Sequence, residues 1–269
     1  MKRENEYMFK SRVRFSESDH HQQITLPGII NYFQDCSTFQ SEALGVGVEA
    51  CMERGRGWVL SSWQVEVDRY PKFGETVAVR TWACGFQGLY GYRNFCLEDE
   101  EGRMAAYAFS VWVYMDMKKG RPIKVDEEEV RRYGCGDPLV MDYASRKIAL
   151  PKETKAGTPF PVRRYHIDTN EHVNNCQYVQ MAQEILPDPE GIFKMRAEYK
   201  KSAVYGDMIY PEYAKEEDRE VAFLCDEAGK PYAWWNLRGD KRMALADGLG
   251  KKKTTDGSQE GRVWHVSWK

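Results

Sequence analysis

Three polar residues at steps of two, Asp168, Asn170 and His172, carry side chains that could together activate water. Alternate residues of an extended strand share one face, so these side chains are expected to point into one cleft. An imidazole can take a proton from water near neutral pH, and a side-chain amide can hold a carbonyl or a water without changing charge. We therefore assign His172 as general base, Asn170 as positioning residue and Asp168 as an orienting or co-acting carboxylate.

A helix is expected directly after this motif, over residues 175–186. The first N–H groups of a helix have no partner within it, so those around Asn174 and Asn175 suit the oxyanion of a tetrahedral intermediate. Cys176 follows His172 at a spacing of four and offers a rival thiolate–imidazole pair. We interpret Cys176 as a packed structural thiol, which is the commoner role of such a residue.

The segments that must position this site follow the same plan in both halves of the chain. Each half begins with an extended segment, continues into a helix and ends in strand-like runs separated by turn residues. A helix followed by an antiparallel meander is an α+β pattern. The expected helices cover 27–44 and 175–186, and the expected strands cover 58–68, 75–83, 90–98, 104–115, 193–204, 208–215, 220–225 and 232–238.

A short pattern also repeats where each extended segment meets its helix. Glu17-Ser-Asp19-His-His21 aligns with Asp168-Thr-Asn170-Glu-His172, so that each offers an acid, an Asx residue and a histidine at steps of two. A duplicated domain explains this repeat. His20 and His21 are neighbours that would point apart in a strand, so we interpret them as remnants of duplication and expect no metal site.

The stretch between residues 118 and 161 differs in composition from both halves, since it holds five prolines and few apolar runs. We interpret it as a crossover that carries one short charged helix at 126–133. The predicted organisation is an N-terminal domain over 1–145, a C-terminal domain over 146–248 and a polar tail over 249–269. Within the tail, residues 263–268 are a candidate last strand.

Composition and charge exclude several classes of protein. With 42% hydrophobic and 30% charged residues, the chain has the composition of a folded globular protein. A net charge of −2 gives no overall attraction for nucleic acid, and no apolar stretch approaches the roughly 18 residues of a membrane span. The first residues lack the apolar core of a signal peptide and the seven cysteines are scattered, so we expect a cytoplasmic protein with reduced thiols.

The stretch Asp168-Thr-Asn-Glu-His-Val-Asn-Asn-Cys-Gln-Tyr178 resembles the active-site signature of the acyl-acyl carrier protein thioesterases. Segments of the first half are similar to the first domain of that family, namely 69–75, 80–82, 92–95, 110–113 and 121–123. The resemblance implies two tandem hot-dog domains, each a curled antiparallel sheet wrapped around a long helix. It also implies hydrolysis of fatty acyl thioesters without cofactor or metal, with catalytic residues from the second domain and an acyl pocket shaped by the first.

One part of the match departs from the family. The family carries Glu-Cys after a Glu-Tyr-Arg-Arg-like run, whereas this chain has Glu198-Tyr-Lys-Lys-Ser202-Ala203. A serine therefore replaces the acidic residue and an alanine replaces the cysteine, which weakens any cysteine–histidine mechanism. Asp168 is left as the best carboxylate, with Ser202 as a candidate hydrogen-bond partner.

The expected partner is an acyl carrier protein, an acidic helical protein that basic side chains beside the catalytic segment could contact. Formation of a homodimer is left open. Two rival hypotheses are an acyl-coenzyme A thioesterase and a catalytically inactive hot-dog protein that binds acyl chains. The change at Ser202 favours the inactive protein, and the intact Asp168, Asn170 and His172 disfavour it. The candidate carrier-binding residues are Arg163, Arg164, Lys200 and Lys201.

Overall fold

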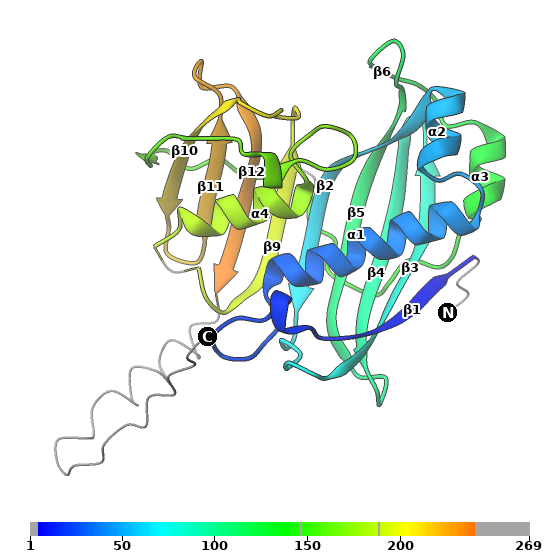
Figure 1. Cartoon of the computed structure of the whole chain (residues 1–269), viewed down its shortest axis with the longest axis horizontal. Coiled ribbons are helices and arrows are strands. Elements are labelled where there is room, and N and C mark those ends of the chain that lie inside the picture. Colours follow the sequence, from blue (N-terminus) through cyan, green and yellow to red (C-terminus); the bar gives the residue numbers. More distant parts are fainter. Residues whose placement is uncertain (1–4, 146, 188, 240–269) are drawn as a thin grey trace, which may run out of the picture. The chain divides into compact units, whose positions relative to one another are not determined.

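A computed structural model describes residues 5–145, 147–187 and 189–239, which are built on one sheet of antiparallel strands (Figure 1). The strand order in the first half is β1 (Tyr7–Arg12), β3 (Thr76–Gln87), β4 (Tyr90–Asp99), β5 (Met104–Asp116) and β2 (Arg56–Val67), with β6 (Arg121–Pro122) beside β5. The order continues with β9 (Ile192–Tyr199), β12 (Pro231–Gly239), β11 (Glu220–Cys225) and β10 (Met208–Lys215), with β7 (Lys155–Ala156) and β8 (Phe160–Pro161) beside β10.

Two helices, α1 (Leu26–Ala43) and α4 (Asn175–Glu184), lie across the same face of the sheet (Figure 1). α1 begins where the Thr25 side chain accepts a backbone N–H of the first turn, and Pro27 occupies that turn, where its missing N–H costs nothing. Gly45, with a φ of 69°, follows the last turn. The predicted first helix is confirmed to within one residue at each end. No helix in the described ranges combines the length and the apolar content of a membrane span.

Large apolar side chains fill the space between α1 and the sheet. Phe33 of α1 packs against Trp63 of β2 and Phe95 of β4, with ring centroids 6.2 and 5.2 Å apart. All three side chains are buried. Burial of one phenylalanine stabilises a fold by roughly 1.5–3 kcal/mol, so this cluster holds α1 on the sheet.

The two halves join through the central pair of strands, β2 and β9, and share one core. Glu66 of β2 lies opposite Lys194 of β9, and the Lys194 Nζ is 2.9 Å from Glu66 Oε1. On the helix face, α1 and α4 are also in contact. The site at the start of α4 therefore has the first helix as a neighbour, although the two helices are far apart in sequence.

Residues 134–145 and 147–150 follow α3 (Glu127–Tyr133), the short helix predicted there, and the first of these segments packs on the sheet face opposite the helices. The Trp82 indole donates to the Asp137 carbonyl at 2.8 Å, and Asn94 Oδ1 accepts the Leu139 N–H at 3.1 Å. This crossover is thus bonded to the sheet. The domain bounds at 145 and 248 stay predictions, and the tail over 249–269 with its candidate strand lies outside the described residues.

Repeated hydrogen bonds show how the two halves correspond. Asp19 and Asp168 each accept a backbone N–H two residues ahead through a side-chain oxygen, at 2.9 and 2.8 Å. Three residues after each of them, Gln22 and Glu171 take left-handed conformations with φ of 59° and 60°. The two loops are the same structure, which supports the predicted duplication.

This correspondence corrects the alignment drawn from sequence by two residues. The sequence pattern paired Glu17 with Asp168, because it matched residue types only, whereas the structure pairs Asp19 with Asp168. Gln23 consequently stands at the position of His172. The first-half loop keeps the carboxylate that builds the turn and lacks the proposed base.

Candidate active site

Asp168, Asn170 and His172 lie in a tight turn between η2 (Arg164–His166) and α4, so the prediction of an extended strand is wrong. Asp168 Oδ1 accepts the Asn170 N–H at 2.8 Å, and the Asp168 N–H donates to the His172 carbonyl at 2.8 Å. Glu171 supplies the left-handed residue that closes the turn. An aspartate that bonds its own backbone two residues ahead favours a turn, and this local bond prevails over the alternating pattern.

The turn is held at both ends by the neighbouring chain. The Val173 N–H donates to the Ala203 carbonyl at 2.9 Å, and the Asn174 N–H donates to the His166 carbonyl at 2.9 Å. Asp168 and His172 are half-buried, and Asn170 is exposed. The backbone of the site is therefore fixed while its side chains remain accessible.

The three side chains are close in the chain but are not bonded to one another. Within the described ranges, no hydrogen bond joins the side chains of Asp168, Asn170 and His172. Catalytic hydrogen bonds are often long in the absence of substrate and shorten in the complex. The catalytic roles assigned to the three residues therefore stay predictions.

Asn174 begins α4 and connects it to α1. Its Oδ1 accepts the Cys176 N–H at 2.8 Å and the Gln34 side-chain amide at 3.3 Å. The prediction of an unpaired backbone donor at Asn174 is wrong, because that N–H binds His166; the role of the Asn175 N–H stays a prediction. Gln34 is a contact that sequence reasoning missed, since nothing local links residues 34 and 174.

Cys176 is a buried packing thiol, as the sequence interpretation held. Its Sγ donates to the Pro27 carbonyl of α1 at 3.2 Å. Burial raises the pKa of the thiol to about 12. A thiolate nucleophile at this position is therefore disfavoured near neutral pH.

His166 is a second site residue that sequence reasoning missed. It is buried, and its Nδ1 accepts the Arg163 N–H at 2.9 Å. Burial and then the nearby Arg163 charge lower the pKa of its imidazole. The internal repeat could have indicated this role. Glu17 occupies the corresponding position in the first half, and its side chain accepts the Arg14 N–H at 2.9 Å. The His166 side chain thus fixes the backbone just before the loop, through its bond to the Arg163 N–H.

The run where the sequence departs from the family lies beside the loop. Ser202 is exposed and directly precedes Ala203, whose carbonyl binds the loop. Glu198 is buried elsewhere, where it accepts the Ile148 N–H at 2.6 Å and the Lys200 ammonium at 2.7 Å. The Glu198 carboxylate therefore binds the crossover and, among the described residues, forms no hydrogen bond to the loop. A supporting role for Ser202 stays a prediction.

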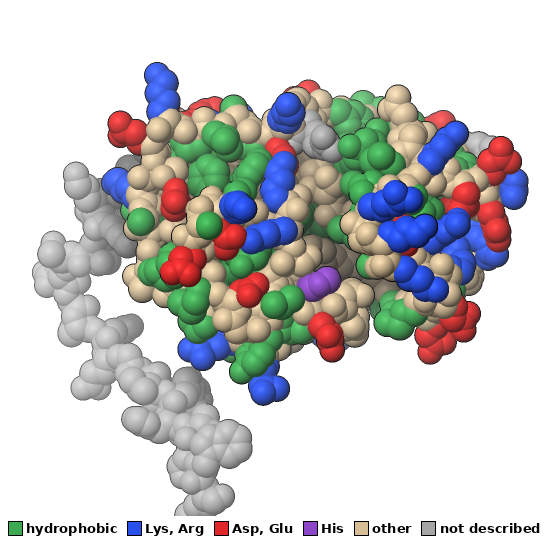
Figure 2. Space-filling model, turned by 90° about the horizontal axis from the view of Figure 1, so that it is seen from above, with side chains coloured by type: hydrophobic (Ala, Val, Ile, Leu, Met, Phe, Trp, Pro, Cys, Tyr) green, Lys and Arg blue, Asp and Glu red, His purple; other side chains and the backbone are tan. Residues whose placement is uncertain are grey.

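Basic side chains gather around a hollow on the face drawn in Figure 2. Arg163 and Arg164 are exposed, and the Arg164 guanidinium lies 4.8 Å from the centre of the Tyr205 ring. Lys200 and Lys201 are also exposed, but they pair with Glu198 and Asp226. Among the described residues, neither arginine forms an ion pair with an acidic side chain, so the two arginines are better placed than the lysines to bind an acidic partner.

A cavity of about 270 Å³ lies on the crossover side of the sheet, away from this loop. Tyr92, Phe109 and Arg196 are among its lining residues, and none of the proposed catalytic residues is. Size alone does not make this cavity the reactive site, because it holds neither the histidine nor the helix start that the chemistry requires.

The duplicated arrangement of a helix on a curled antiparallel sheet is the double hot-dog fold, and solved structures share it. A crystal structure of an acyl-ACP thioesterase from Bacteroides thetaiotaomicron has a TM-score of 0.79 at 21% identity, over 87% of this chain and 97% of that chain. The 12:0-ACP thioesterase from Umbellularia californica has a TM-score of 0.76 at 20% identity, over 87% and 96%.

Family sequence models match both halves. The N-terminal domain of acyl-ACP thioesterases matches residues 4–133, and their C-terminal domain matches residues 150–228. The chain therefore belongs to the acyl-ACP thioesterase family.

Curated relatives agree with this assignment. A palmitoyl-acyl carrier protein thioesterase of Cuphea hookeriana is 31% identical over 54% of this chain, and one of Gossypium hirsutum is 33% identical over 55%. The match spans 37% of the length of each relative. An oleoyl-acyl carrier protein thioesterase of Arabidopsis thaliana is 25% identical over 76% of this chain and 62% of its own length.

Tyr178, the last residue of the signature, fixes the loop after β9 to α4. Its hydroxyl accepts the buried Ala203 N–H at 2.6 Å. Tyr178→Phe leaves that N–H without a partner, so the free energy of unfolding should fall by about 1–3 kcal/mol in urea denaturation. The exposed Tyr165→Phe is the matched control and should change it by less than about 0.5 kcal/mol. Equal effects of the two substitutions would contradict this role.

Proposed function

We propose that this chain hydrolyses the thioester of a fatty acyl group carried on acyl carrier protein and releases the free fatty acid. The observation that carries the proposal is the match of the two thioesterase domains to both halves. The loop with Asp168, Asn170 and His172 supports the proposal, because it is accessible and lies at the start of α4, the positive end of that helix.

In the proposed reaction, His172 takes a proton from a water whose oxygen attacks the thioester carbonyl carbon. A carbon–oxygen bond forms, and the carbonyl π electrons move to oxygen to give a tetrahedral intermediate. Collapse of this intermediate breaks the carbon–sulfur bond, and the proton passes from His172 to the departing thiolate. The products are the fatty acid and the free thiol of the carrier.

The other groups of the loop assist this reaction by position and charge. Asn170 is exposed and can hold the carbonyl or the water by hydrogen bonds. Asp168, four residues before His172, supplies a carboxylate on the same loop, and a carboxylate near the imidazole would favour the protonated form that arises as the water is deprotonated. The positive end of α4 begins at Asn174 and favours the developing oxyanion.

The carrier is the second part of the proposal. Several exposed charge pairs, each worth only ~0.2–1 kcal/mol, can together raise the rate at which an acidic protein associates. Activity on an acyl-ACP substrate should therefore fall steeply with ionic strength. Reversal of both arginines, Arg163→Glu with Arg164→Glu, should selectively raise the KM for that substrate in steady-state assays.

Two comparisons make this experiment specific. Lys200→Glu with Lys201→Glu should have a smaller effect, because these lysines already pair with acids of their own domain. The same acyl group on coenzyme A should show weaker salt dependence, because that carrier has fewer separated charges. Equal salt dependence for both substrates, with no selective effect at the arginines, would favour the acyl-coenzyme A reaction instead.

We propose as well that the protein works in a reducing compartment such as the cytoplasm. The seven cysteines form no disulfide with one another, and four of them are buried. Reduced thiols persist where glutathione and thioredoxin keep cysteines reduced.

A further inference from the structure

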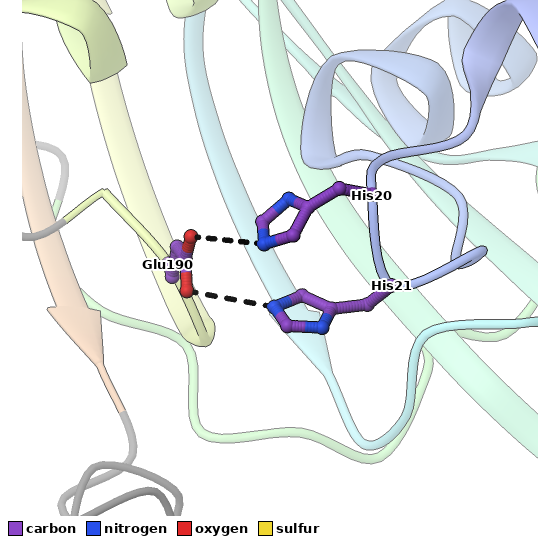
Figure 3. Close-up of side chains that lie close together, drawn as sticks. All are labelled: His20, His21 and Glu190. Atoms are coloured by element: carbon purple, nitrogen blue, oxygen red, sulfur yellow. Dashed lines mark ion pairs between the residues drawn. The ribbon is translucent and has the colours of Figure 1, made fainter. Parts of the chain in front are cut away.

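Two histidines and one glutamate from different halves meet at the first-half turn (Figure 3). His20 Nε2 lies 3.7 Å from one carboxylate oxygen of Glu190, and His21 Nε2 lies 3.7 Å from the other. The expectation that the two imidazoles point apart is wrong, because they occupy a turn rather than a strand. We call these three residues the loop-junction cluster.

The two imidazoles face the same carboxylate side by side. Their ring centroids are 3.9 Å apart, with planes tilted by 40°. Two protonated imidazoles would repel each other at this distance. Two neutral imidazoles with one carboxylate are instead a common ligand set for a borderline divalent ion, which takes nitrogen and oxygen ligands.

The donor atoms lie somewhat further apart than in a bound zinc site. Zinc binds histidine nitrogen at about 2.0–2.1 Å and carboxylate oxygen at about 2.0–2.2 Å, so donors in a tetrahedral site lie about 3.3 Å apart. The observed nitrogen–oxygen distances are 3.7 Å, each to a different carboxylate oxygen, and the three donor atoms lie within 4.8 Å of one another, so the cluster must contract to hold an ion. The side chains are 51–70% exposed, so small rotations can close the site around an ion.

We propose that the loop-junction cluster binds one zinc ion, with water completing the coordination. Among the described residues, it is the one group of three histidine, cysteine or acidic donors within 4.8 Å of one another. The ion joins the turn at residues 19–23 of the first half to Glu190 of the second half. This turn lacks the proposed base, so zinc here stabilises the fold and takes no part in hydrolysis.

Isothermal titration calorimetry of the metal-free full chain with zinc chloride tests the proposal. The background carries Cys135→Ser and His265→Ala, which remove an exposed thiol and a histidine outside the described residues. One ion should bind per chain. His20→Ala, His21→Ala and Glu190→Gln should each weaken binding by roughly tenfold or more, since even indirect partners of a metal contribute about 10–100-fold.

Two further measurements separate this site from the candidate active site and from general binding. His172→Ala should leave the zinc affinity unchanged. Zinc at a concentration that saturates the background protein should raise its unfolding temperature by more than that of each of the three cluster variants, because stabilisation follows the affinity of the folded state. Absence of one-to-one binding, or cluster variants that bind zinc as the background protein does, would overturn the proposal.

Discussion

Replacement of His172 by alanine is expected to lower kcat/KM for a carrier-bound acyl thioester by roughly 10²–10⁴-fold, the usual contribution of a positioned general base. The protein should stay folded, because the turn uses the His172 backbone carbonyl and not its imidazole. Steady-state release of the free thiol measures the rate, and circular dichroism measures the fold.

Cys176→Ala is the matched control for this prediction. Its thiol is buried against Pro27 with a pKa raised to about 12, so turnover should remain within a few fold of the parent. The opposite pattern, with a silent His172→Ala and an inactive Cys176→Ala, would require a thiolate mechanism.

Asp168→Asn is expected to lower kcat by roughly 10²-fold while leaving the loop intact. Asparagine still offers an oxygen to the Asn170 N–H and supports the same turn, but it carries no charge to stabilise the imidazolium. Steady-state kinetics combined with urea denaturation separate the catalytic effect from any structural one.

The duplicated loop supplies an internal control. Asp19 builds the same turn beside Gln23 instead of a histidine, so Asp19→Asn should leave kcat unchanged. If Asp168→Asn retained full activity, the carboxylate would be a turn-forming group only. If the two substitutions lowered kcat equally, the effect would come from the turn and not from the charge at the site.

Helices α1, α3 and α4 and most strands could be predicted because their signals are local, whereas the seven-residue helix at Val48–Arg54 was missed. Thr25, Pro27 and Gly45 mark the bounds of α1, and these residues act within a few positions of themselves. The alternation in β2 likewise reflects one face packed on the core, where Trp63 and Val65 are buried. Such features depend on neighbouring residues, so a single sequence contains them.

The loop geometry was harder to predict, because two local signals conflict. The steps of two at Asp168, Asn170 and His172 suit a strand, but the aspartate side chain satisfies its own backbone in a turn. Residue types alone also placed the internal repeat two residues out of register. The hydrogen bonds of Asp19 and Asp168 are what define the register.

Contacts between distant segments could not be predicted from a single chain. Gln34 reaches Asn174 only because α1 and α4 pack together. Glu198 accepts the N–H of Ile148 in the crossover, a residue fifty positions earlier in the chain. The meeting of the first-half turn with Glu190 depends in the same way on how the two halves pair.

The central claim is hydrolysis by water at the His172 loop, and isotope labelling tests it most directly. Acyl-ACP is incubated with the protein in ¹⁸O-labelled water, and the released acid is analysed by mass spectrometry. The account predicts a fatty acid that carries one labelled oxygen, formed by the parent protein and strongly reduced with His172→Ala. Release of no acid, or formation of labelled acid at equal rates by both proteins, would contradict it.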